Sequence, residues 1–365
     1  MDLNWPEHVL RLQREALDFA QAWAADHDVV DDSWVLGYSD EANASLAERG
    51  WVGMTWPAEY GGGGRSDLER FAVAEVLIAH GVPLAGIWIC DRQIGPVLLQ
   101  YGTPEQRRRW LPDMTAGRSR WCIGMSEPGA GSDLAHLTTS AVRDGEHFVV
   151  SGQKVWTSGA ANADWCYLIC RTDATARPHE GLSELVVAMD SPGLTVRPIR
   201  DATGDSHFCE VFFDEVRVPL DHLVGEPNGA FRQTMRQLEH ERGGIDRLVS
   251  NKAVYRMALA AADASDPLVR QDIGYFESGY AIGRDMVLRN VLRQAPAGYS
   301  SVTKVFCTEF EQRVAEFAVG VFGMEAAVQN RVSRNAMYAP AYTIQGGTTT
   351  VLRNVIGERV LGLPR

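Results

Sequence analysis

The stretch that decides the fold is Trp121-Cys122-Ile123-Gly124-Met125-Ser126-Glu127-Pro128-Gly129-Ala130-Gly131-Ser132-Asp133. Its first five residues are largely apolar and predict a buried strand. The next eight are glycine, proline and mostly short polar residues, which predict a loop. Such a loop offers backbone N–H groups and small hydroxyls to a ligand. Ordinary surface loops share this composition, so composition alone favours a surface loop over a binding loop.

Short β-rich segments continue on the C-terminal side of this loop as far as residue 223. Residues 138–143 and 146–150 flank Asp144-Gly145, a dipeptide that favours a tight hairpin turn. Further short strands are expected at 165–171, 185–189, 194–198 and 209–213. Strands this short, separated by Gly and Pro, predict an antiparallel barrel or sandwich instead of a parallel sheet.

Helical patterns lie on both sides of these strands. In the N-terminal part, Thr103-Pro104-Glu105-Gln106 has the hydroxyl, proline and glutamine of a capped helix start. In the C-terminal part, Leu238, Glu241, Ile245 and Leu248 keep one helical spacing. The predicted fold class is therefore α+β. It comprises an N-terminal helical domain (1–118), a central antiparallel β-barrel or sandwich domain (119–226) and a C-terminal helical domain (227–365), with boundaries uncertain by about five residues.

Composition excludes several classes of protein. Apolar residues make up 45% of the chain and charged residues 22%, which is typical of a soluble globular protein. The net charge of −12 argues against nucleic acid as a partner. The chain has no apolar segment of membrane-spanning length and no signal peptide. Its six scattered cysteines lack metal-ligand spacing, so no metal is expected, and they are interpreted as reduced core thiols of a cytoplasmic protein.

Residues 126–133 resemble the signature loop of the acyl-CoA dehydrogenase family. Matches to other motifs of that family follow in order and cover essentially the whole chain, at 50–53, 57–62, 101–106 and 152–159. The resemblance implies the helical–β–helical architecture, with a four-helix bundle as its C-terminal domain. It further implies an FAD-dependent oxidoreductase that desaturates an acyl thioester at its α,β carbons, as in fatty acid metabolism. The thioester would be carried on CoA or on an acyl carrier protein.

The resemblance also implies which residues form the site. A flat flavin requires an aromatic wall and a few hydrogen-bond donors near its ring nitrogens. By position, the residues expected to bind FAD are Ile123, Met125, Ser126, Trp156, Thr157, Ser158, Thr348 and Thr350. Those expected to bind the substrate are Gly131, Ser132, Arg242 and Gly346. The alternative for Trp156 is a core aromatic residue at the end of a strand.

The catalytic base departs from the commonest family pattern. Many members carry it as the Glu of a C-terminal Tyr-Glu-Gly-Thr motif, where this chain has Gly346. The resemblance then points to a second arrangement, found in isovaleryl-CoA, long-chain and bacterial sterol side-chain acyl-CoA dehydrogenases, with Glu241 just before Arg242. A carboxylate on an apolar stripe is costly unless it is paired or functional, and burial would raise its pKa toward neutrality. The alternatives are a solvated Glu241 paired with Arg242, and Glu239 as the base.

The resemblance leaves the assembly open. The Arg-x-Phe-Gly element that reaches FAD across a subunit interface is absent near residues 266–271, and the following glycine-rich loop is reduced to residues 321–324. The chain is therefore expected in a homotetramer or dimer, or in a heterotetramer with FAD at only some interfaces. An electron-transferring flavoprotein is the expected acceptor. Two other functions remain possible on this fold, namely a flavin-dependent monooxygenase and a non-catalytic subunit of a heteromeric dehydrogenase.

Overall fold

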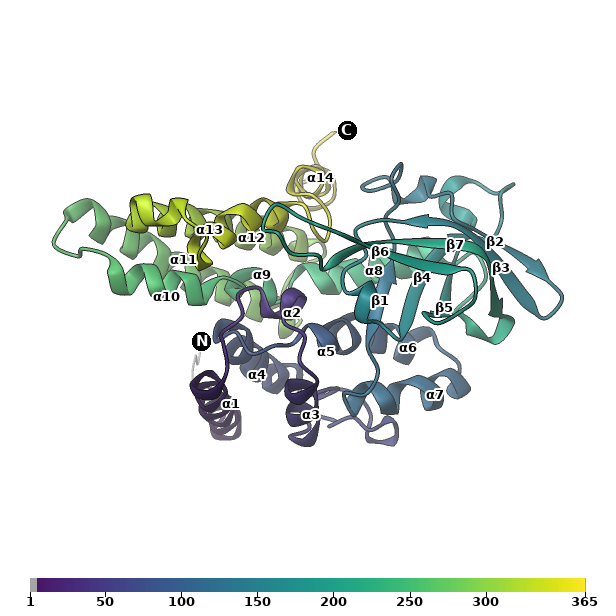
Figure 1. Cartoon of the computed structure of the whole chain (residues 1–365), viewed down its shortest axis with the longest axis horizontal. Coiled ribbons are helices and arrows are strands. Elements are labelled where there is room, and N and C mark those ends of the chain that lie inside the picture. Colours follow the sequence, from purple (N-terminus) through teal and green to yellow (C-terminus); the bar gives the residue numbers. More distant parts are fainter. Residues whose placement is uncertain (1–4, 365) are drawn as a thin grey trace. The chain divides into compact units, whose positions relative to one another are not determined.

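A computed structural model describes residues 5–364, except for the side chains of residues 239–241. The chain divides into two compact units, each assembled from separate segments. The sheet unit consists of residues 38–64 and 84–237, and the helical unit of the segments up to residue 37, 65–83 and from 238 onward. Figure 1 shows the course of the chain through these segments. The domain boundaries expected near residues 118 and 226 remain a prediction.

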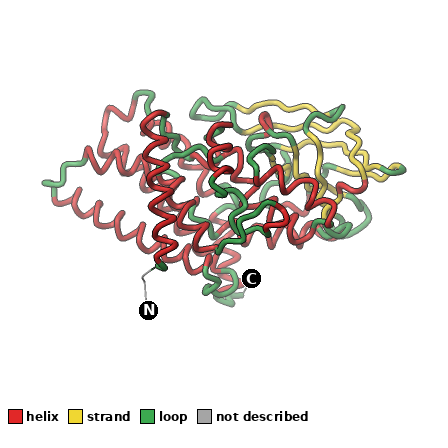
Figure 2. The backbone as a smooth tube through the Cα atoms, turned by 90° about the horizontal axis from the view of Figure 1, so that it is seen from below, coloured by secondary structure: helices red, strands yellow, loops and turns green. Residues whose placement is uncertain are grey.

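The strands of the sheet unit form one sheet of eight strands, drawn in yellow in Figure 2. Its hydrogen-bonded order is β6-β7-β3-β2-β4-β5-β8, and β1 pairs with β4 off this path. The strands are β1 (Trp121–Gly124), β2 (Ser140–Asp144), β3 (His147–Lys154), β4 (Trp165–Arg171), β5 (Leu182–Ala188), β6 (Leu194–Ile199), β7 (Phe208–Pro219) and β8 (Leu223–Val224).

Most of the sheet is antiparallel, as predicted, and Gly145 forms the β2–β3 turn with a φ of 57°. The sheet also contains parallel pairing that the sequence did not predict: β2 meets β4 at Ser140 and Arg171, and β1 runs parallel to β4 over its whole length. The reason is the length of the connection. The chain between β1 and β4, residues 125–164, contains the whole β2–β3 hairpin and returns in the starting direction, as a parallel pair requires.

Helices complete both units. In the sheet unit, α7 begins as predicted: Thr103 Oγ1 accepts from the Gln106 backbone N–H at 3.2 Å, and Gln106 Oε1 accepts from the Thr103 N–H at 3.0 Å. In the helical unit, α12 packs against α10, α11, α13 and α14. The sheet unit holds α3 (Asp40–Glu48), α5 (Ala85–Ile89), α6 (Gly95–Tyr101) and α7 (Pro104–Thr115). The helical unit holds α1 (Glu7–Asp26), α2 (Ser33–Leu36), α4 (Asp67–Ala79), α9 (Asp246–Val249), α10 (Lys252–Ala261), α11 (Pro267–Val291), α12 (Tyr299–Phe322), α13 (Arg331–Tyr338) and α14 (Thr349–Val355).

The helix predicted across Leu238 and Leu248 is interrupted in the structure. Helix α8 (Ala230–Arg242) ends before Gly243-Gly244, and α9 begins at Asp246. Two adjacent glycines weaken a helix by about 1 kcal/mol each relative to alanine, which explains the break. At Gly243 a Cβ atom would lie 3.0 Å from the Asn290 side chain of α11, so a glycine is also needed here for close approach.

Two further expectations concern burial and membranes. All six cysteines are buried and none is in a disulfide. Within residues 5–364, no helix has the length and apolar character needed to cross a bilayer.

Candidate functional site

The loop that follows β1 is held in a defined conformation by backbone hydrogen bonds. Glu127 and Ala130 exchange two of them, at 2.9 and 3.1 Å, which closes the turn around Pro128-Gly129. The Val155 N–H donates to the Ser126 carbonyl at 2.9 Å, so the loop is joined to the end of β3. Gly131 and Ser132 are exposed at its tip, where the sequence predicted substrate contacts.

A buried ion pair, which the sequence did not reveal, stabilises this loop. Lys154 Nζ lies 2.9 Å from Glu127 Oε1 and donates to the Met125 carbonyl at 3.0 Å. Glu127 also accepts hydrogen bonds from the backbone N–H groups of Thr138 and Thr139, at 2.6 and 2.8 Å. Burial alone would raise the pKa of Glu127, but the Lys154 charge and these donors outweigh it and lower the pKa to about 2. The Glu127 carboxylate is therefore ionised; burial lowers the pKa of Lys154, although Glu127 opposes that shift, and the pair fixes the loop between β1 and β2.

A second unusual feature lies directly after β3. Trp156 has a φ of 59°, which is uncommon for a non-glycine residue, and its ring is 57% exposed while its edge contacts Phe208. Thr157 next to it is buried, and its backbone is paired with that of Cys209 at 3.0 and 3.2 Å. Its hydroxyl Oγ1 is buried yet has no hydrogen-bond partner among the described residues. A strained, exposed aromatic residue beside an unsatisfied hydroxyl is a feature of ligand sites.

These features suit a flavin. The Trp156 ring offers an apolar wall, and the Thr157 hydroxyl lacks only a partner. Ile123, Met125 and Ser126 are half-buried at the end of β1, and the Val155–Ser126 hydrogen bond joins that end to the Trp156 segment. The FAD-binding residues predicted in the sheet unit therefore lie on two adjoining segments. Ser158, half-buried, continues the second of them.

The unsatisfied hydroxyl gives a first prediction. Thr157→Val should weaken FAD binding about fivefold, because a hydrogen bond in a buried site contributes about 1 kcal/mol. Thr157→Ser should retain the parental affinity, since it keeps the hydroxyl. The measurement is the FAD dissociation constant from quenching of flavin fluorescence, with exposed Thr195→Val of β6 as the control. Equal affinity in Thr157→Val and Thr195→Val would contradict a flavin contact.

In the helical unit, two residues predicted to bind substrate contact each other. Arg242 Nε, at the end of α8, donates to the Gly346 carbonyl at 3.3 Å. Gly346 and Gly347 have φ values of 65° and 92°, in the left-handed region that favours glycine. The backbone at residue 346 therefore fits the glycine found here, and the carboxylate that many family members carry at this position would be strained.

The residues on either side of Gly346 and Gly347 are also held by hydrogen bonds. Gln345 accepts from Arg247 Nη1 at 3.4 Å and donates to the Tyr338 hydroxyl at 2.8 Å. Thr348 caps α14 by accepting from the Val351 N–H at 3.3 Å, while Thr350 is exposed on that helix. Because the Thr348 hydroxyl is the acceptor in this cap, it can still donate its proton in a second hydrogen bond. The FAD contacts expected at Thr348 and Thr350 remain predictions.

The predicted base, Glu241, lies on α8, one residue before the helix ends at Arg242. The side chains of Glu239, His240 and Glu241 are outside the described residues. The role of Glu241 as the base, and the alternative that Glu239 is the base, therefore stay predictions.

The N-terminal half of α8 is anchored in the sheet unit by Glu184 of β5, another residue that the sequence did not indicate. Its carboxylate accepts from Gln233 Nε2 and, at 2.9 Å, from the Thr234 hydroxyl, both on α8. It also accepts from the Tyr167 hydroxyl at 2.7 Å. Burial raises the pKa of Glu184 to about 7, although these donors oppose the shift. The carboxyl is thus an anchor of the helix that carries Glu241, and it titrates near neutrality.

This shift predicts a pH dependence of stability. A carboxyl whose pKa is raised in the folded state stabilises the fold fully below its unfolded pKa of 4.5, and the contribution is lost as the pH rises through about 7. The loss is about 3 kcal/mol. We expect the free energy of unfolding in urea to fall over this interval in the parent and to fall less in Glu184→Gln. Parallel curves for the two proteins would contradict the prediction.

Family models and known proteins match this chain. Models of three acyl-CoA dehydrogenase domains match the chain: the N-terminal domain at 6–118, the middle domain at 122–216 and the C-terminal domain at 228–361. The chain is 37% identical over 340 residues to acyl-CoA dehydrogenase IpdE1 of Mycobacterium tuberculosis, covering 88% of this chain and 87% of that one. It is 34% identical over 343 residues to acyl-CoA dehydrogenase FadE29 of the same organism, covering 88% and 87%.

Solved structures agree. The Tcur3481-Tcur3483 steroid ACAD matches with a TM-score of 0.91 and 31% identity over all of both chains. The ChsE4-ChsE5 complex from Mycobacterium tuberculosis matches with a TM-score of 0.86 and 29% identity, also over all of both chains. At 22% identity, butyryl-CoA dehydrogenase from Megasphaera elsdenii shares the fold, with a TM-score of 0.83.

The three matched domain models and the named relatives place the chain in a class of flavoprotein oxidoreductases. The chain belongs to the acyl-CoA dehydrogenase family, whose members are FAD-dependent flavoproteins that act on acyl-CoA. The family, the fold class, the enzyme class and the cofactor predicted from the sequence are thereby confirmed.

Proposed function

We propose that this chain catalyses the α,β-dehydrogenation of an acyl thioester, with Glu241 as the base that removes the α-proton. When bound, FAD supplies a hydride acceptor at N5 for the hydrogen that leaves Cβ. Trp156, Thr157, Ser158 and the end of β1 would hold the flavin. The exposed ring and the unpartnered hydroxyl described above support this assignment.

The observation that carries the proposal is the contact between Arg242 and Gly346. By the resemblance, many family members carry their base at the position of Gly346, and this chain carries Glu241 next to Arg242. Because Arg242 donates to the Gly346 carbonyl, the end of α8 lies beside the position at which those family members carry their catalytic carboxylate. A base from either position would therefore serve the same part of the site. The Gly346 N–H would stabilise the enolate oxygen, a role that needs only backbone.

The substrate proposed is an acyl thioester with a bulky, ring-bearing acyl group. Its support is the likeness to the solved steroid ACAD. The exposed Gly131 and Ser132 of the loop would contact the pantetheine arm, which CoA and an acyl carrier protein present alike.

Anaerobic titration of the FAD-loaded protein tests this function. Thioesters of increasing acyl size, including a steroid side-chain thioester, are added while flavin absorbance is followed. We expect bleaching of the oxidised flavin by ring-bearing thioesters, and weaker or no bleaching by short linear ones. Reduction only by a nicotinamide donor, followed by oxygen uptake, would favour the monooxygenase alternative and overturn the proposal.

We further propose that the active protein is an oligomer that passes electrons to an electron-transferring flavoprotein. Its support is the absence of the family's usual interface Arg-x-Phe-Gly element and the likeness to a two-chain complex, ChsE4-ChsE5. The number of FAD molecules bound per chain distinguishes a homo-oligomer from a heterotetramer. One FAD per chain in the purified protein indicates a homo-oligomer, whereas FAD uptake only after co-expression with a second dehydrogenase chain indicates a heterotetramer.

A further inference from the structure

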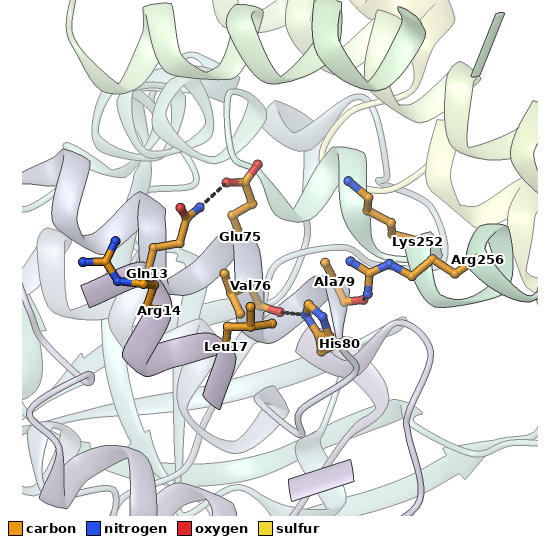
Figure 3. A pocket seen from close by; sticks show the side chains of 9 residues that line it. All are labelled: Gln13, Arg14, Leu17, Glu75, Val76, Ala79, His80, Lys252 and Arg256. Carbon is orange, nitrogen blue, oxygen red and sulfur yellow. Dashed lines mark hydrogen bonds between the residues drawn. The ribbon is translucent and has the colours of Figure 1, made fainter. Parts of the chain in front are cut away.

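The helical unit contains a hollow of about 400 Å³ between α1, α4 and α10 (Figure 3). None of the residues assigned above to flavin, substrate or base lines it. Pockets for small ligands usually have volumes from about 300 to 1,000 Å³, so it is large enough for a small molecule. Leu17, Val76 and Ala79 give it an apolar part, and its other lining side chains are charged or polar.

The charges around the hollow are unbalanced. Lys252 and Arg256, one turn apart on α10, both line it, and His80 at the end of α4 joins them. In the part of the chain that the structure describes, no carboxylate forms an ion pair with Lys252 or Arg256. The acidic lining residue, Glu75, is held by two hydrogen bonds from Arg284, at 2.6 and 3.1 Å. Like charges at this helical spacing repel each other, so an anion between Lys252 and Arg256 would be stabilising.

Lys252, Arg256 and His80 are nevertheless held in place by neutral partners. Arg256 Nη1 donates to the Ala79 carbonyl at 2.9 Å, which leaves its other donors free. His80 Nδ1 lies 2.8 Å from the Val76 carbonyl and donates to it, so its Nε2 accepts in the neutral ring and donates only in the protonated ring (Figure 3). The Lys252 ammonium lies 4.6 Å from the centre of the Tyr280 ring. Burial is the main reason that the pKa of Lys252 and of His80 is lowered, and neighbouring positive charges add to the shift. Glu75 and Glu277 oppose it at Lys252, and the hydrogen bond to the Val76 carbonyl opposes it at His80.

We propose that this hollow binds a small molecule carrying a dianionic group, a phosphate or a dicarboxylate, between Lys252, Arg256 and His80. An arginine fork and a lysine are groups that recognise such anions, and a bound dianion would favour the protonated form of His80, whose Nε2 would then donate to it. The chain as a whole has a net charge of −12, so a concentration of positive charge here is not a general property of its surface. The apolar residues beside the cations would accommodate a short carbon skeleton.

Calorimetric titration of the FAD-loaded full chain tests the proposal. Inorganic phosphate and succinate are the two probes, at a constant ionic strength set with sodium chloride. We expect saturable binding of at least one probe by the parent, and the tighter of the two identifies the class of ligand. The variant Lys252→Met/Arg256→Gln should bind it at least about tenfold more weakly, because two charge-assisted hydrogen bonds are lost.

The matched control is Arg11→Gln on α1, which removes an exposed cation outside the hollow. It should bind the probe as the parent does. If the double variant fails to fold, His80→Gln tests the same site and should weaken binding severalfold. Absence of saturable binding by the parent, or equal binding by parent and folded variants, would overturn the proposal.

Discussion

Replacement of Glu241 by glutamine should leave FAD bound and slow the bleaching of the flavin by substrate by about a thousandfold or more. A general base contributes about 10² to 10⁴ to the rate, and an amide cannot accept the α-proton. The measurement is the rate of flavin reduction after anaerobic mixing with a thioester that reduces the parent. Binding of the thioester, seen as a spectral shift of the flavin, should persist.

The neighbouring residue provides the control. Glu239→Gln removes one carboxylate from the same helix. We expect the thioester to reduce the flavin of this variant at close to the parental rate. If Glu241→Gln reacts as fast as the parent and Glu239→Gln does not, the assignment of the base is wrong while the fold and the flavin site are unaffected. If both variants react at the parental rate, neither carboxylate is the base.

Local sequence signals predicted much of the fold. The Thr103 cap and the Asp144-Gly145 turn appear in the structure because their chemistry acts over four residues or fewer. The break in the helix at Gly243-Gly244 was missed because helical spacing, read alone, continues across two glycines. The parallel β1–β4 pair was missed because its direction depends on the number of turns between the strands.

The site was predictable only in part, for a related reason. Resemblance supplied the residue types, and the structure shows that Trp156 and Thr157 have the exposure and the unsatisfied hydroxyl that a flavin requires. Contacts between distant residues have no local signal. Arg242 and Gly346 are 104 positions apart. Likewise, a single lysine at the end of a strand gives no indication of its partner, so the Glu127–Lys154 pair emerged only from the structure.

That buried pair carries the second large effect. Lys154→Met should lower the free energy of unfolding by about 3–5 kcal/mol, because it leaves the Glu127 carboxylate buried without its counter-charge. The Met125 carbonyl also loses its donor at the position where the flavin edge is expected. We therefore expect weaker FAD binding as well as lower stability, measured by urea unfolding and by the FAD dissociation constant.

Two comparison variants separate charge burial from the loss of a contact. Arg217→Met breaks an exposed ion pair with Asp144 whose atoms lie 2.9 Å apart, and it should cost less than about 1 kcal/mol. Glu127→Gln/Lys154→Met removes both buried charges and should recover a large part of the stability lost in Lys154→Met. Because Thr138 and Thr139 also donate to Glu127, the recovery should be incomplete, and the loop should bind FAD less tightly than the parent. Stability of Lys154→Met equal to that of Arg217→Met would show that the pair does not fix the loop.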